Sequence, residues 1–275
     1  TGPQLLDRIL KERRRKWEED QLAAFAKAGK TPPAKWKEKY KEPAGVEGGN
    51  LPQLPEGWCW ASVEQLGDVQ LGRQRSPKNR SKDFPTKYIR AANLTEHGLD
   101  LTDVLDMEFT PDAMKSYRLM AGDIILSEAS GSPDQVGKPA VWEEEIPDCC
   151  FQNTVIRLRP YILGSKYLLT VFRHFYWNKV FAKVAGGVGI NHLSAAKFAR
   201  LVIAIPPLSE QQQMVEEVER RFSIMEESQA QIAANLTRST RLRQSILKRA
   251  FEGDLVPQDP KDEPATALLE RIQKE

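Results

Sequence analysis

The fold is decided by the segment that begins with PPLSEQQ at Pro206 and ends with LRQSILKRAFEG at Gly253. After the opening pair of prolines, no Pro or Gly interrupts this segment before its final glycine, which is typical of one continuous helix that stops at Gly253. Ser209 and Gln212 have the spacing of a capping box, which predicts the helix start. At ~1.5 Å per residue, such a helix is roughly 65 Å long.

Apolar residues recur along this helix in a three–four alternation, which predicts a seam for pairing with a second helix. We expect the seam to consist of Val215, Val218, Phe222, Met225, Gln229, Ile232, Leu236, Ser239, Arg243, Ile246 and Ala250. Because a single long helix has no globular core of its own, it has to lie against another helix. The polar seam residues lower stability but can fix the register of the pair.

Charge is divided along the same helix. Residues 209–230 contain six Glu and two Arg, whereas residues 231–251 contain only Arg and Lys as charged residues. An antiparallel partner of the same kind would pair opposite charges, so the pattern favours antiparallel pairing. The alternative is a solvated face whose charges act only on the helix dipole.

The composition sets broad limits on function. A net charge of +2 over 275 residues does not indicate binding to polyanions, so a nucleic-acid site would have to be a local patch. Three cysteines, two of them adjacent, form neither a disulfide framework nor a metal-ligand spacing, and they favour a reduced, cytoplasmic compartment. No signal peptide or membrane-spanning apolar run is found. Because the chain starts with Thr1 rather than Met, we expect a fragment or a processed protein.

The pattern of apolar runs and turns predicts an α+β (mixed α/β) domain joined to helical segments. We expect an N-terminal helix in residues 1–30, a linker in 31–54, the α/β domain in 55–207, the long helix in 208–253, and a tail with a short helix in 254–275. Within the domain, strands are expected at 87–91, 123–126, 140–142, 154–158 and 201–205, and one helix at 166–184.

The two ends of the chain contain similar sequences. LLDRI at Leu5 resembles LLERI at Leu268, an offset of 263 residues, and Lys11-Glu12 matches Lys274-Glu275. The match indicates that the chain is one unit of a larger tandem duplication. The helix that pairs with its long helix would then belong to another copy of the same unit. The alternative is chance, because short sequences of this type are common in helices.

Several short motifs occur in order inside residues 55–207. They are Gly57–Trp60 followed by Leu66-Gly67, Ile89–Leu94, Leu119–Leu126 followed by Gly137-Lys138, Gln152–Pro160, and Gly186–Leu193. In this order, and together with the two ends of the long helix, they resemble the specificity subunits of type I restriction-modification systems over about Leu54–Val256.

This resemblance implies a mechanism. In such subunits, two target-recognition domains lie at opposite ends of an antiparallel pair of spacer helices, and each reads one half of a split double-stranded DNA sequence in the major groove. Methyltransferase subunits and a restriction/translocase subunit dock on this frame. The chain is then expected to be half of such a subunit, with one recognition domain and one spacer helix. It would form a homodimer or pair with a second specificity half through the seam.

The residues expected to contact DNA are polar or basic and lie on predicted loops. They are Arg73, Gln74, Arg75, Ser76, Lys78, Asn79, Arg80, Arg90, Asn93, Ser130, Lys138, Asn191 and His192. Arg and Gln can contact guanine and adenine edges, while Lys and Ser can bind phosphates. A solvated loop is the alternative for residues 72–82, buried structural hydrogen bonds for Arg90 and Asn93, and a tight turn for residues 186–192.

The sequence contains no complete catalytic or cofactor-binding motif. The Gly-rich stretch at Gly186 lacks a following Gly-Lys-Ser/Thr, and the three histidines have no Cys or His at metal-ligand spacing. We therefore expect a non-catalytic DNA-recognition subunit without a cofactor or metal. The alternatives are the recognition portion of a fused restriction-methyltransferase enzyme and a structural coiled-coil protein with a protein-binding head.

Overall fold

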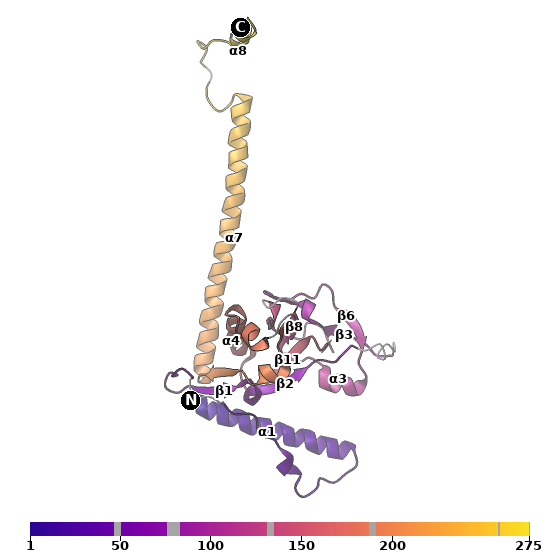
Figure 1. Cartoon of the computed structure of the whole chain (residues 1–275). Coiled ribbons are helices and arrows are strands. Elements are labelled where there is room, and N and C mark those ends of the chain that lie inside the picture. The colour runs from indigo at the N-terminus through magenta and orange to yellow at the C-terminus, as the bar shows by residue number, and fades with distance from the viewer. Residues whose placement is uncertain (47–50, 76–82, 131–134, 187–190, 258, 275) are drawn as a thin grey trace. The chain divides into compact units, whose positions relative to one another are not determined.

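The computed structural model describes residues 1–46, 51–75, 83–130, 135–186, 191–257 and 259–274, in two compact units, Thr1–Glu216 and Glu217–Glu275 (Figure 1). The helices are α1 (Gly2–Lys27), α2 (Val63–Leu66), α3 (Pro111–Tyr117), α4 (Ser165–Trp177), α5 (Val180–Ala185), α6 (Ala195–Ala199), α7 (Leu208–Glu252) and α8 (Ala265–Lys274). The strands are β1 (Cys59–Ser62), β2 (Gly67–Leu71), β3 (Pro85–Ile89), β4 (Leu94–Thr95), β5 (Gly98–Leu99), β6 (Leu105–Glu108), β7 (Ile124–Ser127), β8 (Ala129–Ser130), β9 (Pro139–Val141), β10 (Cys150–Phe151), β11 (Val155–Pro160), β12 (Asn191–His192) and β13 (Val202–Ile205).

A four-stranded antiparallel sheet in the order β2-β11-β7-β9 forms the centre of the first unit. All four residues of β7 are buried, because both faces of the sheet are covered by other elements. The principal core cluster lies against this sheet and includes Ile124, Ile156, Leu158, Leu168 and Phe172. α4 covers the sheet by burying one apolar face, in agreement with its contacts to β9 and β7.

The described residues of the α/β domain form four smaller sheets as well, of which β12-β8 and β4-β5 are two-stranded ladders of two residues per strand. β10-β3-β6 is a three-stranded sheet in which β10 and β3 are parallel. β1 pairs antiparallel with β13, from Cys59 opposite Ile205 to Ser62 opposite Val202, so the first and last strands of the domain are neighbours. The prediction of a mixed α/β domain is confirmed.

The helix expected at residues 166–184 is two helices, so the prediction of one continuous helix is wrong. Lys179 has a left-handed backbone (φ 58°), which ends α4 at Trp177 and starts α5 at Val180. The turn lets Phe181 bury its ring against Phe172 and Phe198, with ring centroids 6.2 Å apart in both pairs. Apolar residues at helical spacing continue across this break, which is why the sequence pattern did not show it.

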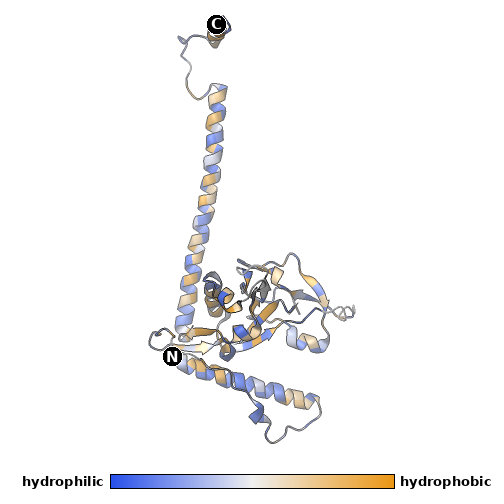
Figure 2. Cartoon of the chain, in the orientation of Figure 1, coloured by the Kyte–Doolittle hydropathy of each residue, from blue (hydrophilic) through white to orange (hydrophobic). Residues whose placement is uncertain are grey.

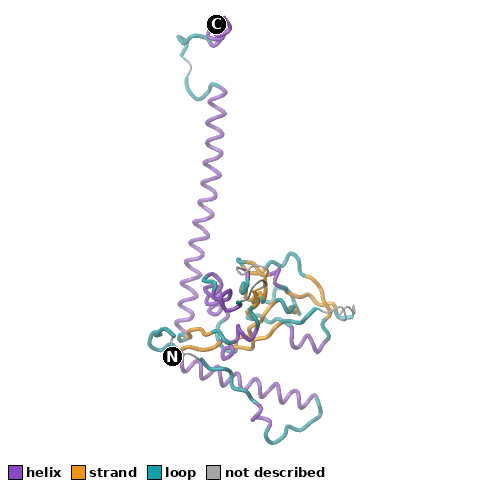
Figure 3. The backbone as a smooth tube through the Cα atoms, in the orientation of Figure 1, coloured by secondary structure: helices purple, strands orange, loops and turns teal. Residues whose placement is uncertain are grey.

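The segment between α1 and β1, which the sequence indicates as a linker, packs on α1 in its described part (Figure 3). The Trp36 ring stacks on Trp17 at 5.8 Å, and the Tyr40 ring contacts Trp17 edge-on at 5.2 Å. The Arg13 guanidinium donates to the Tyr40 hydroxyl (2.6 Å) and to the Lys41 carbonyl oxygen (3.0 Å). These contacts hold the described part of the segment against α1.

The long helix is confirmed as α7, which ends before Gly253, where φ is 79°. Ser209 lies inside the helix, because the first helical residue is Leu208; the capping prediction for Ser209 is therefore wrong. Figure 2 shows apolar patches alternating with polar ones along α7. In the second unit, large seam residues are exposed: Met225 (51%), Ile232 (59%), Leu236 (65%) and Ile246 (45%).

Candidate nucleic-acid interface

Three of the predicted contact residues meet where β8 pairs with β12. In this antiparallel ladder Asn191 lies opposite Ser130 and His192 lies opposite Ala129. The Leu193 N–H also donates to the Glu128 carbonyl oxygen at 2.8 Å, which extends the pairing by one bond. The ladder thus brings together two segments that are about sixty residues apart in the sequence. We call the surface around it, with residues 73–75, 138 and 152–154, the polar edge.

Residues 152–154 connect the parts of the polar edge. The Asn153 N–H donates to the Arg73 carbonyl oxygen at 3.0 Å, and the Glu128 N–H donates to the Thr154 carbonyl oxygen at 2.9 Å. The Thr154 hydroxyl accepts a bond from the Ala91 N–H at 3.1 Å. This short segment, just before β11, therefore holds the ends of β2, β3 and β7 in fixed register.

The basic loop after β2 begins in a constrained backbone. A Cβ added to Gly72 would lie 2.2 Å from the Gln152 carbonyl oxygen, so only glycine allows the strands to approach this closely. Arg73 donates to the Glu108 carbonyl oxygen, and its guanidinium lies 5.2 Å from the Phe109 ring centroid. These interactions give Arg73 a structural role. Gln74 and Arg75 are exposed. The predicted contacts Ser76, Lys78, Asn79 and Arg80 lie outside the described residues.

Asn93 has the structural role that the sequence left open. Its side chain is buried, its amide group donates to the carbonyl oxygens of Asp100 (2.9 Å) and Asp103 (3.0 Å), and its side-chain oxygen accepts from the Arg90 N–H (3.1 Å). Arg90 is half-buried and pairs with the Asp103 carboxylate. Asn93 is thus committed to holding the turn after β3, which removes it from the candidate contact set.

A buried acid lies directly behind the polar edge. The Glu128 side chain is 8% exposed, and its carboxylate oxygen lies 3.0 Å from His192 Nε2. Burial raises the pKa of Glu128, and the neighbouring His192 opposes that shift. The exposed His192 ring is therefore held through Nε2 by a buried carboxylate.

Lys138 and two residues not predicted from the sequence complete the polar edge. Lys138 is half-buried, and its N–H donates to the Ser127 hydroxyl at 3.0 Å. Gln152 and Asn153 are half-buried, and no described residue is hydrogen-bonded to their side-chain amides. Such amides can contact base edges in the same way as Gln74. The sequence contained them in the QNT motif, where they served only as a sign of family resemblance.

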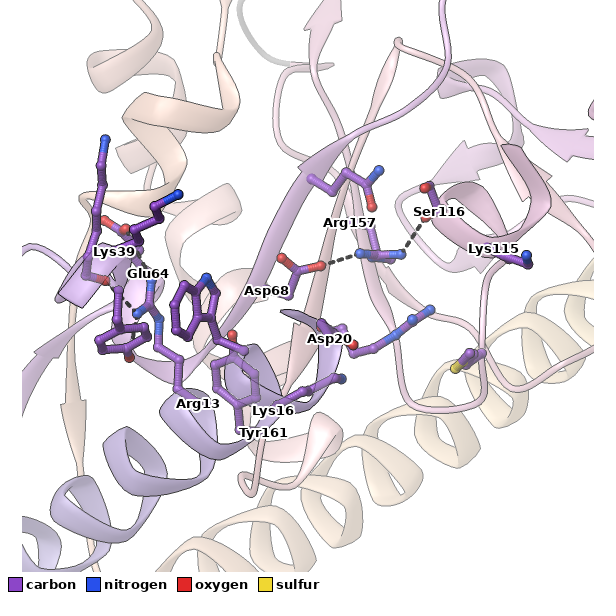
Figure 4. Close-up of a pocket in the computed structure, with 16 residues that line it drawn as sticks. Arg13, Lys16, Asp20, Lys39, Glu64, Asp68, Lys115, Ser116, Arg157 and Tyr161 are labelled. Atoms are coloured by element: carbon purple, nitrogen blue, oxygen red, sulfur yellow. Dashed lines mark hydrogen bonds and ion pairs between the residues drawn. The ribbon is translucent and has the colours of Figure 1, made fainter. Parts of the chain in front are cut away.

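A cleft of about 770 Å³ lies between the middle of α1 and the strands β2 and β11 (Figure 4). Arg157, 3% exposed, pairs there with the Asp68 carboxylate and donates to the Ser116 carbonyl oxygen at 3.2 Å, while its Nε has no partner among the described residues. Burial lowers the pKa of Arg157. Arg13 and Lys16 contribute further positive charge from α1. The cleft is lined by none of the predicted contact residues.

The described residues contain no group of three or more His, Cys, Asp or Glu side chains that could hold a metal ion. No helix in the described part of the chain is long and apolar enough to cross a membrane. Burial raises the pKa of both Cys149 and Cys150 to about 12, which makes their thiolates scarce at neutral pH.

The family model and the curated proteins that match this chain all belong to type I restriction systems. The model of the type I restriction modification DNA specificity domain matches residues 55–238. The chain is 29% identical over 214 residues to the type I restriction enzyme StySPI specificity subunit of Salmonella potsdam, covering 75% of this chain and 45% of that protein. It is 28% identical over 232 residues to the EcoKI specificity subunit of Escherichia coli strain K12, covering 80% and 48%. The chain spans about half the length of these curated relatives.

Solved structures show the same fold. The HsdS subunit from Thermoanaerobacter tengcongensis has a TM-score of 0.52 and 20% identity, with 92% of this chain and 56% of that chain covered. A chain from a study of complex assembly and conformational transition of the type I R-M system has a TM-score of 0.55 and 21% identity, with 92% and 57% covered.

Proposed function

Since its residues 55–238 match the family's model, this chain belongs to the family of type I restriction modification DNA specificity domains, and we propose that its first unit reads one half of a bipartite double-stranded DNA target. The observation that supports this most directly is the β8–β12 ladder, which places Ser130, Asn191 and His192 at one polar edge. Because their side-chain types can contact base edges, this edge is the proposed reading surface.

Within the polar edge, the charged residues have a different role from the residues of the β8–β12 ladder. Arg75 is exposed and has no partner among the described residues, so its guanidinium is free for a phosphate or a guanine. Lys138 contributes a second cation. Phosphate contacts fix the position of the domain on the duplex, whereas the ladder residues select the sequence.

The second unit supplies the proposed contact with a second specificity half. The exposed apolar seam of α7 pairs antiparallel with an equivalent helix, so that two recognition domains are held at a fixed separation. In this proposal the chain is non-catalytic and needs no cofactor. Methyltransferase subunits and a restriction/translocase subunit bring the chemistry.

The proposal is tested by selecting bound duplexes from a random-sequence pool and measuring affinity for the selected DNA at several salt concentrations. Arg75→Glu should lower affinity about ten-fold and reduce the salt slope by about one, as expected for loss of a phosphate contact. His192→Ala should instead relax the selected sequence at one position, because it removes a base-edge contact.

Arg8→Glu on α1 is the matched control for Arg75→Glu, because Arg8 is also exposed and without a partner among the described residues. It makes the same change in net charge away from the polar edge, so DNA affinity should stay within about two-fold of the unchanged chain. Equal losses for the two variants would show a non-specific charge effect and refute the assignment of Arg75. No enrichment of any sequence would refute sequence reading by this chain.

A further inference from the structure

The cleft between α1 and the central sheet is lined by the polar face of β2 and β11 (Figure 4). Side chains alternate along a strand, and the apolar residues of both strands pack into the principal core cluster on one face of the sheet. The alternating residues Asp68, Gln70, Arg157 and Arg159 lie on the other face and line the cleft together with the middle of α1. We call this space the α1 cleft.

Arg157 is the residue of the α1 cleft whose hydrogen bonding is incomplete. Its side chain is 3% exposed, its Nη1 donates to the Ser116 carbonyl oxygen at 3.2 Å, and its Nη2 donates to the Asp68 carboxylate. Its Nε is buried and has no partner among the described residues. Nε and Nη2 together form the fork with which a guanidinium binds two oxygens of one anion. Half of this fork therefore lacks an acceptor.

Asp68 does not supply the missing oxygen, because it accepts from Nη2 alone. Its side chain is 50% exposed, so its carboxylate can turn into water at little cost. Burial and the neighbouring Arg159 lower the pKa of Arg157, which means that Asp68 compensates this buried charge poorly. An anion with two free oxygens would bind Nε and Nη2 at once, the arrangement that guanidinium groups form with carboxylates and phosphates.

The other charges of the lining favour an anion with more than one negative charge. Arg13 is already paired with Glu64 at 3.6 Å. Among the lining acids, Asp20 is exposed and has no basic partner among the described residues. The lining cations without an acidic partner among the described residues are Lys16, Lys39 and Lys41. The surplus charge is thus positive, which fits a phosphate group better than a single carboxylate.

The size of the α1 cleft indicates a ligand larger than an inorganic ion. Its volume of about 770 Å³ lies within the range of pockets for small organic molecules. Trp17 and Tyr161 contribute aromatic rings to the lining. The Tyr161 hydroxyl has no hydrogen-bond partner among the described residues, and burial raises the pKa of Tyr161 to about 12, so the hydroxyl remains a donor at neutral pH. Cations and rings in one cleft suit an organic molecule that carries a phosphate group.

We propose that the α1 cleft binds a phosphate-bearing small molecule. Two phosphate oxygens accept from Nε and Nη2 of Arg157 in place of Asp68, Lys16 on α1 contacts the same phosphate, and the organic part lies against Trp17 and Tyr161. The ligand site is separate from the reading of DNA, since none of the predicted DNA-contact residues lines the α1 cleft. The proposal therefore stands or falls independently of the proposed function.

Isothermal titration calorimetry of the full chain tests this site, with inorganic pyrophosphate and adenosine monophosphate as probes in a phosphate-free buffer of low salt. Both probes should bind, and adenosine, which has no phosphate, should bind at least about ten-fold more weakly than its monophosphate. Lys16→Ala should weaken binding of both probes about ten-fold, because it removes a charge-assisted hydrogen bond.

Lys11→Ala is the matched control, because Lys11 is on the same helix, does not line the α1 cleft, and its removal changes the net charge equally. It should leave affinity for both probes within about two-fold of that of the unchanged chain. Equal losses in Lys16→Ala and Lys11→Ala, or no binding of either probe to the unchanged chain, would overturn the proposal.

Nuclear magnetic resonance of arginine Nε–H groups reports on the fork directly. The Arg157 signal, assigned by its absence in Arg157→Lys, should shift during titration with pyrophosphate. The Arg220 signal is the internal control and should stay in place, since its Nε donates to Glu217 at 2.9 Å on α7. An unchanged Arg157 signal at saturating pyrophosphate would overturn the assignment of the phosphate to this residue.

Competition experiments separate a small molecule from two other sources of negative charge. Duplex DNA should not displace adenosine monophosphate, and a hexaglutamate peptide should bind more weakly than either probe. Displacement by DNA would assign the α1 cleft to the DNA backbone, and tighter binding of the peptide would assign it to an acidic protein segment. Either result would overturn the proposal.

Discussion

Replacement of Ile232 by Ala should weaken self-association of the chain about 100-fold. Ile232 lies on the seam of α7 and is 59% exposed. The substitution removes three carbons, each worth ~0.8 kcal/mol when fully buried, so the exposed part gives up about 1.4 kcal/mol per copy on pairing. Because an antiparallel pair of identical helices contains the residue twice, the total is about 3 kcal/mol, or about 100-fold in Kd.

Sedimentation equilibrium of both proteins over a wide concentration range measures this effect. Ile224→Ala is the matched control: Ile224 is 51% exposed on the same helix but faces away from the seam in the heptad pattern. Both substitutions change helix propensity equally, so only the seam position should matter. The reasoning is refuted if the two variants weaken association equally, or if the unchanged chain remains monomeric at the highest concentration.

Three other predictions concern the first unit. Asp123→Ala should destabilise it by about 3 kcal/mol in urea unfolding, because Asp123 is 1% exposed and accepts two 2.7 Å bonds from the Arg159 guanidinium, which would lose its charged partner and keep only the Arg118 carbonyl oxygen. Glu128→Gln should make the free energy of unfolding depend less on pH. Burial raises the pKa of Glu128, so the stability that its protonated form contributes is present at acidic pH and is lost as pH rises through the raised value. Gln does not titrate and therefore removes this dependence. Lys179→Gly should stabilise the unit by about 1 kcal/mol in the same urea assay, since glycine accepts the left-handed backbone without strain. Unchanged stability of Asp123→Ala or Lys179→Gly, or an unchanged pH dependence of stability in Glu128→Gln, would contradict the corresponding argument.

Local patterns in the sequence predicted the elements that depend on local rules. The length of α7 follows from a heptad pattern without Pro or Gly, and its end follows from Gly253. Three strands of the central sheet, β7, β9 and β11, follow from short apolar runs, whereas β2 was not expected from the sequence. The break at Lys179 was not predictable in this way, because the φ value of one residue is determined by how Phe181 packs against Phe172.

The candidate site was less predictable because its roles depend on partners far away in the sequence. Asn93 was selected as a polar residue at a strand end, yet its amide satisfies the carbonyl groups of Asp100 and Asp103. The β8–β12 ladder contains two residues on each strand, too few for a periodic pattern. The family resemblance selected the candidate loops, and burial and hydrogen bonding determine which side chains in them remain available for the proposed contacts.

The pairing of β1 with β13 has a consequence for how such chains can change. Because Cys59 lies opposite Ile205, the polypeptide enters and leaves the recognition domain at the same place. A segment with adjacent ends can be replaced as a cassette without altering the helices on either side of it. Under the proposed function, an exchange of residues 59–205 for those of a relative with the same strand pair would therefore transfer DNA preference while the length of α7 stays unchanged.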